Sequence, residues 1–178
     1  MTNEIIISGF GGQGVMAIGK TLCEAGMKEG KAVSWLPSYG PEMRGGTANC
    51  CVVIDEKQII SPVVLEPTEL IAMNLPSLLK FESTVQPGGS IFVNSSIVKE
   101  KVQRTDVKAY YVPCIDIADE LGNPKVANMV MLGAYIEAMG NLGTDTIKEM
   151  LVHMFTGPKA KLVDLNIEAL RRGAACVK

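Results

Sequence analysis

The chain has few of the residues that build self-contained catalytic or metal-binding sites. It contains one histidine, His153, and five cysteines, and no two cysteines are spaced as a C-x-x-C pair. The missing spacing excludes the usual zinc and iron–sulfur motifs, and the odd cysteine count favours reduced thiols over a disulfide framework. The sequence also lacks a nucleophile elbow and a pair of carboxylates spaced as a general acid and base. We therefore expect no catalytic residue and no metal site in this chain alone.

An excess of charge and a long apolar run are also absent. The formal net charge is −2, so the chain has no basic footprint for nucleic acid or for an anionic membrane. The most apolar stretch, residues 126–139, is interrupted by Asn128 and Glu137 and is shorter than the roughly 20 residues that cross a bilayer. The amino-terminal residues carry no basic region typical of a signal peptide. These absences predict a cytoplasmic protein that binds neither nucleic acid nor membrane.

Strand and helix patterns alternate along the chain. Its 178 residues, 47% of them apolar, suit one domain with a full sheet core. The patterns predict strands at residues 4–8, 31–36, 47–54, 58–61, 69–73, 90–94 and 107–112, and helices at residues 13–28, 76–83, 115–121 and 126–139. We predict a single three-layer α/β/α domain over residues 1–178. Its Rossmann-like mixed sheet is mostly parallel, with one antiparallel hairpin between 47–54 and 58–61.

Two more helices are predicted near the carboxyl terminus. Thr146 and Glu149 have capping-box spacing, which predicts the start of a helix. We expect apolar stripes on both helices to face the core. These stripes are Ile147, Met150, Leu151 and Met154 on the first helix, and Val163, Ile167, Leu170 and Ala174 on the second.

The stretch GFGGQGVMAIGKT, residues 9–21, matches two phosphate-binding patterns that share Gly14. Its second half matches the triphosphate pattern G-x-x-x-x-G-K-T, which ends in Lys20 and Thr21. However, the four residues after Gly14 are apolar at helical spacing, and Lys20 would lie about 9 Å along the helix axis. We interpret this match as a coincidence within an amphipathic helix. An independent nucleotide-binding protein, either a P-loop-like NTPase or a reductase, is the alternative hypothesis.

The first half of the stretch matches the dinucleotide pattern G-x-G-x-x-G and stands at the expected position, between a strand and a helix. An NAD site also needs an acidic residue at the end of the second strand. That position has the sequence SWLP, without a carboxylate. Two interpretations stay open: the loop accepts an anion at the helix N-terminus, or its glycines only close a tight turn.

A second loop, SYGPEMRGG at residues 38–46, follows the second predicted strand. In a doubly wound sheet it would lie beside the first loop, at the edge where ligands of such sheets bind. Arg44 could bind a carboxylate or phosphate with two parallel hydrogen bonds. The alternative is a local pair between Glu42 and Arg44 on a solvated turn. We favour a functional loop, because large side chains stand on a backbone dense in glycine and proline.

The segments GFGGQG, SYGPEMRGG and NMVMLGAY (residues 128–135), in this order along nearly the whole chain, resemble the gamma subunit of 2-oxoacid:ferredoxin oxidoreductases. This group includes the pyruvate, 2-oxoisovalerate and 2-oxoglutarate enzymes. The resemblance implies an α/β domain that works only within a multi-subunit enzyme. That enzyme decarboxylates a 2-oxoacid on thiamine diphosphate, passes electrons through iron–sulfur clusters to ferredoxin, and delivers the acyl group to coenzyme A.

The sequence has no Gly-Asp-Gly thiamine signature and no cluster cysteines. The resemblance therefore places thiamine diphosphate and the clusters on partner chains: thiamine-binding alpha and beta subunits and a ferredoxin-like subunit. It also implies coenzyme A binding or partner contact at both loops, and self-association of the isolated chain through its partner face is a further expectation. The implied site residues are Gly9, Gly11, Gly12, Gln13, Gly14, Ser38, Tyr39, Glu42 and Arg44.

Overall fold

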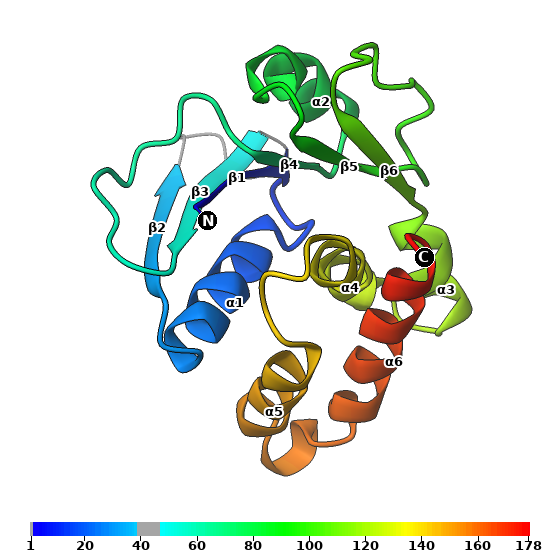
Figure 1. The fold of residues 1–178 in the computed structure, drawn as a ribbon. Coiled ribbons are helices and arrows are strands. Elements are labelled where there is room, and N and C mark those ends of the chain that lie inside the picture. The colour runs from blue at the N-terminus through cyan, green and yellow to red at the C-terminus, as the bar shows by residue number, and fades with distance from the viewer. Residues whose placement is uncertain (1, 39–46) are drawn as a thin grey trace.

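The computed structural model describes residues 2–38 and 47–178, which form a six-stranded sheet flanked by helices (Figure 1). The strands are β1 (Asn3–Phe10), β2 (Ala32–Ser38), β3 (Thr47–Asp55), β4 (Glu69–Ala72), β5 (Ser90–Asn94) and β6 (Lys108–Val112). The α-helices are α1 (Val15–Lys28), α2 (Leu75–Phe81), α3 (Cys114–Glu120), α4 (Ala127–Met139), α5 (Thr144–Met154) and α6 (Leu162–Ala175). Three short 3-10 helices lie at Glu82–Thr84, Pro124–Val126 and Gly157–Lys159.

The sheet is mixed and mostly parallel, in the order β2-β3-β1-β4-β5-β6. Strand β3 runs antiparallel to both of its neighbours, β1 and β2, whereas β1, β4, β5 and β6 are parallel to one another. Strands β1 and β2 therefore run in the same direction with β3 between them, and α1 makes the crossover. The predicted α/β class and mixed sheet are confirmed.

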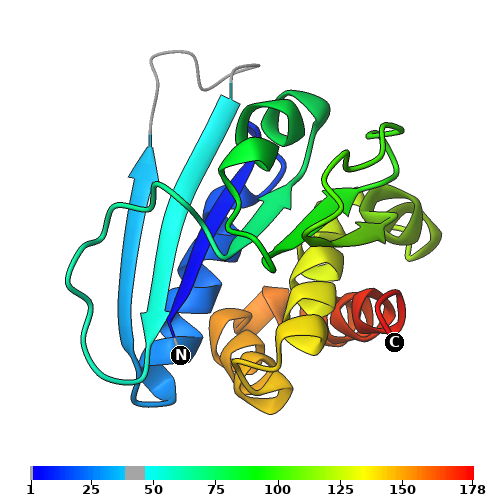
Figure 2. The same cartoon turned by 45° about the horizontal axis from the view of Figure 1, so that its top comes forward.

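The predicted hairpin is wrong in one of its strands. Residues 58–61 form no strand, and the antiparallel partners of β3 are β1 on one side and β2 on the other. Because both edges of β3 are already paired, β3 has no free edge for a hairpin partner. The segment after β3 instead runs irregularly past β2 on the outside of the sheet (Figure 2). It directs Val64 into the core and leaves Ile60 exposed.

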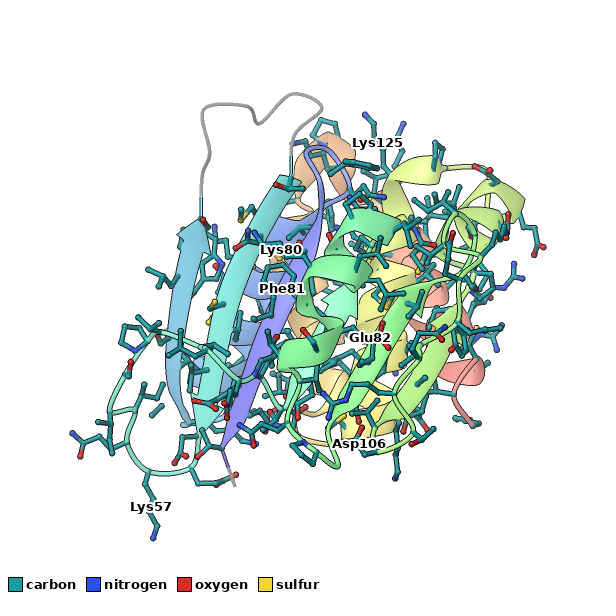
Figure 3. All side chains as sticks on the ribbon, turned by 90° about the horizontal axis from the view of Figure 1, so that it is seen from above. Lys57, Lys80, Phe81, Glu82, Asp106 and Lys125 are labelled. Carbon is teal, nitrogen blue, oxygen red and sulfur yellow. The ribbon has the colours of Figure 1, made fainter. Side chains whose placement is uncertain are left out.

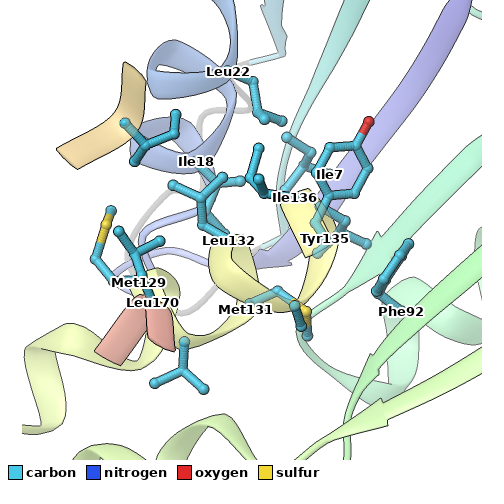
Figure 4. Packing of buried hydrophobic residues seen from close by; sticks show 14 of the residues in the cluster. Ile7, Ile18, Leu22, Phe92, Met129, Met131, Leu132, Tyr135, Ile136 and Leu170 are labelled. Carbon is cyan, nitrogen blue, oxygen red and sulfur yellow. The ribbon is translucent and has the colours of Figure 1, made fainter. Parts of the chain in front are cut away.

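Each face of the sheet has its own apolar core. Helices α1 and α4 cover one face, with α5 and α6 outside them, and α2 covers part of the other face (Figure 1). Helix α4 lies at the centre of the larger core, where Tyr135 is fully buried with its ring centroid 5.4 Å from that of Phe92 (Figure 4). Burial of such a side chain contributes about 1.5–3 kcal/mol, which explains the nearly all-apolar sequence of this helix.

The last helix meets α4 through small residues. A Cβ atom added to Gly173 would lie 1.8 Å from the carbonyl oxygen of Val130, and one added to Gly133 would lie 2.1 Å from that of Leu170. The two backbones are therefore in direct contact. Of the predicted stripe, Leu170 is buried and Ile167 packs partly buried against the core, but the fully buried positions of α6 are otherwise Asn166, Ala169 and Gly173. A search for large apolar residues does not find a face made of glycine and alanine.

Helix α5 begins earlier than its predicted capping box. It starts at Thr144 after Gly143, with no side-chain cap, and Thr146 lies inside it. The backbone N–H of Gly143 instead donates to the Glu29 carboxylate at 2.7 Å. A group distant in the sequence therefore holds the start of α5. Three positions of the predicted stripe, Ile147, Met150 and Leu151, are buried, but Met154 is exposed.

A buried carboxylate stands at the start of β4. Glu69 is 3% exposed, and its two oxygens accept hydrogen bonds from Asn3 Nδ2 at 3.0 Å and from Thr68 Oγ1 at 2.8 Å. Burial raises the pKa of Glu69 above its usual 4.5, and the nearby Glu4 adds to the rise. The hydrogen bonds from Thr68 and Asn3 oppose this shift in the pKa without cancelling it.

We expect Glu69→Gln to gain stability relative to the native chain as the pH rises from 4.5 to 8. The folded state binds the Glu69 proton more tightly than the unfolded state. The contribution of Glu69 to the free energy of unfolding is therefore complete below pH 4.5, and it is lost as the pH rises through the pKa of the folded state. Urea unfolding at several pH values measures the difference. The exposed Glu66→Gln is the matched control, and a difference for Glu69→Gln that stays constant with pH would contradict the prediction.

Candidate functional site

The Gly loop, residues 9–14, joins β1 to α1. It needs its glycines for different physical reasons. Gly14 caps α1 in the left-handed conformation with φ 77°, and a Cβ there would lie 2.5 Å from Asn128 Nδ2. Gly12 has φ 96° and faces open space. At Gly9, a Cβ would lie 2.6 Å from Gln13 Oε1. The loop is therefore a tight turn whose backbone is accessible at Gly12 and closely packed at Gly9 and Gly14.

Gln13 holds this loop against the neighbouring strands. Its Oε1 accepts the backbone N–H of Phe10 at 2.7 Å, and its Nε2 donates to the carbonyl of Met73, just after β4, at 3.0 Å. Asn94, the last residue of β5, donates its Nδ2 to the same carbonyl at 3.2 Å. The Met73 carbonyl thus joins the carboxyl ends of β1, β4 and β5, which is the edge where ligands of open α/β sheets bind.

A cavity of about 250 Å³ lies at this edge. It is lined by Gly12, Gln13, Gly14, Met73, Asn94, Ile115, Pro124, Lys125, Ala127 and Asn128. Helix α1 starts here with no side-chain cap and no acidic residue in its first turn, so its N-terminal N–H groups favour an anion. Lys125 stands beside the loop and adds a positive charge (Figure 3). The arrangement suits a ligand that carries a phosphate.

Sequence reasoning missed most of this cavity wall. Lys125 and Asn94 belong to no motif, and only the fold brings them to the Gly loop. No motif assigns a role to Asn128 within the segment NMVMLGAY. Its side chain packs against Gly14, so this segment and the first glycine segment are in contact.

The structure contradicts the triphosphate interpretation of residues 14–21. Helix α1 begins at Val15, so the residues that would wrap a phosphate are helical. Lys20 is mostly exposed and pairs with Glu24 at 3.6 Å. Thr21 is buried, and its hydroxyl donates to the Ala17 carbonyl at 2.8 Å. Neither side chain is placed to hold a nucleotide.

Of the second loop, residues 38–46, only Ser38 belongs to the described residues. Ser38 ends β2 and pairs with Asn49 of β3, while Gly9 of β1 pairs with the adjacent Ala48. The ends of β1 and β2 therefore lie at the same edge, with β3 between them. Tyr39, Glu42 and Arg44 lie outside the described residues.

The described residues contain no cluster suited to a metal. Among residues 2–38 and 47–178, no three His, Cys, Asp or Glu side chains could hold a metal ion together. Burial raises the pKa of Cys23 to about 11 and that of Cys50 to about 12, so both thiols stay protonated. His153 is exposed on α5. None of the described helices is long and apolar enough to span a bilayer.

The fold agrees with that of known proteins. The gamma subunit of keto/oxoacid ferredoxin oxidoreductase from Geobacter sulfurreducens superposes with a TM-score of 0.83 at 28% identity over 98% of both chains. A 2-oxoglutarate:ferredoxin oxidoreductase from Magnetococcus marinus, solved with 2-oxoglutarate, coenzyme A and succinyl-CoA bound, has a TM-score of 0.90 at 23% identity. This chain covers 31% of that protein, and the likeness concerns the fold.

The sequence comparisons establish the family. Residues 4–176 match the family model of pyruvate ferredoxin/flavodoxin oxidoreductase. The ketoisovalerate oxidoreductase subunit VorA of Methanothermobacter thermautotrophicus is 42% identical over 96% of this chain, which spans about a third (35%) of that relative. The 2-oxoglutarate synthase subunit KorC of Methanothermobacter marburgensis is 36% identical over 85% of both chains. The chain belongs to the pyruvate ferredoxin/flavodoxin oxidoreductase family.

We expect Lys20→Met to change the free energy of unfolding by no more than about 0.5 kcal/mol, because an exposed ion pair contributes little. Neither the native chain nor this variant should gain thermal stability from ATP with magnesium, since a bound ligand would raise the melting temperature. Ile18→Ala, fully buried on the same helix, serves as control and should cost about 2–5 kcal/mol. An ATP-dependent shift that disappears in Lys20→Met would restore the triphosphate interpretation.

Proposed function

We propose that the chain is a subunit of a thiamine diphosphate-dependent 2-oxoacid:ferredoxin oxidoreductase. The complex would oxidatively decarboxylate a 2-oxoacid such as 2-oxoglutarate and form the acyl-CoA. The match to KorC over 85% of both chains carries this proposal. The common gamma subunit of the pyruvate/ketoisovalerate oxidoreductases of Thermococcus litoralis, 31% identical over 89% of both chains, supports the same role. Both relatives are named as subunits, and both are close to this chain in length.

Thiamine diphosphate and the iron–sulfur clusters would then be held by partner subunits. No two cysteines of this chain are spaced as a C-x-x-C pair, which is the spacing typical of cluster ligands. We assign the partners as thiamine-binding alpha and beta subunits and a ferredoxin-like subunit. The cysteines of this chain are all free, which suits a cytoplasmic complex in a reducing compartment.

This chain would contribute assembly and a place for coenzyme A, whose thiol accepts the acyl group. The cavity at the carboxyl edge fits the phosphate groups of that cofactor, because it combines the N-terminus of α1 with the ammonium of Lys125. Gly12 allows close approach to the backbone, because nothing lies within 4 Å of a Cβ placed there. We include in the same site Gly9, Gly11, Gln13 and Gly14, and from the second loop Ser38, Tyr39, Glu42 and Arg44.

Co-expression tests the proposed complex. An affinity tag on this chain should retain a thiamine-binding chain and an iron–sulfur chain from the same organism, and the purified assembly should reduce ferredoxin with a 2-oxoacid and coenzyme A. The contacts of a subunit persist through purification, because obligate interfaces are large and apolar. A chain that never associates with such partners would contradict the proposal.

In the assembled enzyme, Lys125→Ala should raise the KM for coenzyme A by at least about tenfold, because a hydrogen bond to a charged group contributes about 1.5–3 kcal/mol. Lys159→Ala, an exposed lysine outside the cavity, is the matched control and should leave this KM unchanged. Arg44→Ala, measured in the same way, is expected to weaken coenzyme A use or assembly. Normal assembly with an unchanged KM in both variants would favour a scaffold subunit that binds no small molecule.

A further inference from the structure

The cavity beside the Gly loop contains three side-chain amides, those of Gln13, Asn94 and Asn128. An amide side chain offers an acceptor oxygen and a donor nitrogen, so it can either build the wall of a cavity or bind a ligand inside it. Which of the two applies to each amide depends on the hydrogen-bond partners that the fold already provides.

Gln13 and Asn94 build the wall. Gln13 binds the backbone at Phe10 and at Met73 through its two polar atoms. Asn94 is fully buried; its Nδ2 donates to the Met73 carbonyl at 3.2 Å, and its Oδ1 accepts the backbone N–H of Ser96 at 3.4 Å. Both amides hold strand ends in place, and each of their polar atoms has a partner within the chain.

Asn128, in the first turn of α4, has a different environment. Its side chain is half-buried against Gly14, and its amide makes no hydrogen bond with any residue that the structure describes. It does not cap the helix, whose N-cap residue is Val126. Asparagine is also a poor helix former. Neither capping nor helix propensity therefore explains an amide at this position, and both of its polar atoms are available to a ligand.

A phosphate group by itself would use only part of this cavity. The N–H groups at the start of α1 and the ammonium of Lys125 favour the anion. The Asn128 oxygen is an acceptor and cannot bind a phosphate oxygen, which is an acceptor too. The wall also contains the apolar side chains of Met73, Ile115 and Pro124. These parts of the wall suit an uncharged, flat group that carries a donor beside an acceptor.

The adenine of coenzyme A has this pattern. Its N6 amino group is a donor beside the acceptor N7, and an asparagine amide binds these two atoms through a pair of hydrogen bonds. The pantetheine arm offers only secondary amides, whose N–H and C=O point in opposite directions in the trans form. The two groups of such an amide cannot both reach one asparagine side chain, so the adenine is the better match to Asn128.

We propose that Asn128 determines specificity for the adenine of coenzyme A, an inference that rests on the coenzyme A site proposed above. Its Oδ1 accepts from the N6 amino group and its Nδ2 donates to N7, while the phosphates lie at Gly12 and Lys125. The nucleotide end of the cofactor occupies this cavity, and the thiol end extends out of it.

Steady-state kinetics of the assembled enzyme with coenzyme A and with its deaminated analogue tests this role. The analogue contains hypoxanthine in place of adenine, so an acceptor oxygen replaces the N6 donor. We expect the native enzyme to have a KM at least about fivefold higher for the analogue, because a bidentate contact to a base discriminates by this factor or more. Asn128→Ala should raise the KM for coenzyme A by at least about fivefold and make the two KM values nearly equal. The kcat should change little, since the adenine is remote from the reacting thiol.

Gln58→Ala, which removes an exposed amide outside the cavity, is the matched control and should leave both KM values unchanged. Equal KM values for the two ligands in the native enzyme would overturn the inference, and this comparison needs no variant. The same ratio of KM values in Asn128→Ala as in the native enzyme would also overturn it. In either case, a KM raised alike for both ligands in Lys125→Ala would still support the proposed coenzyme A site. An assembly whose turnover does not depend on coenzyme A would overturn the proposed function itself.

Discussion

The carboxyl edge of the sheet depends on one backbone oxygen, the carbonyl of Met73. It accepts hydrogen bonds from Gln13 of the Gly loop and from Asn94 at the end of β5, while the N–H of Met73 donates to Ser8 of β1. Parallel strands end at one edge without being joined there, because their connections pass over the faces of the sheet. These hydrogen bonds hold three strand ends and the loop before α1 at fixed distances, and this geometry defines the cavity beside Lys125.

The other wall of that cavity depends on the position of α4. The start of this helix carries Asn128 under Gly14, and further along its backbone touches that of α6 at Gly133 and Gly173. Glycine inside a helix costs about 1 kcal/mol relative to alanine. Here it allows two backbones to pack without side chains between them, and the contact fixes how α4 lies against the sheet. The proposed coenzyme A site therefore depends on a helix contact on the far side of α4.

The two edges of the sheet differ in their chemistry. The carboxyl edge offers N–H groups at a helix start and a lysine, which favour an anion. The amino edge carries the buried carboxylate of Glu69, which accepts hydrogen bonds from Asn3 and Thr68. The two edges lie at opposite ends of the strands, so the length of the strands separates them.

The sequence determined the local elements, the α/β class and the family, because apolar periodicity and the order of the glycine segments depend on neighbours along the chain. It also showed that the dinucleotide pattern lacks the acidic residue needed at the end of the second strand. Lys20, in addition, lies too far along a helix to bind the phosphates of a nucleotide. Only the tertiary structure decided that residues 58–61 form no strand, since both edges of β3 were already paired. It alone brought Lys125, Asn94 and Asn128 to the Gly loop. These residues are distant in the sequence, and their proximity is set by strand order and helix packing, which leave no periodic signal in the chain.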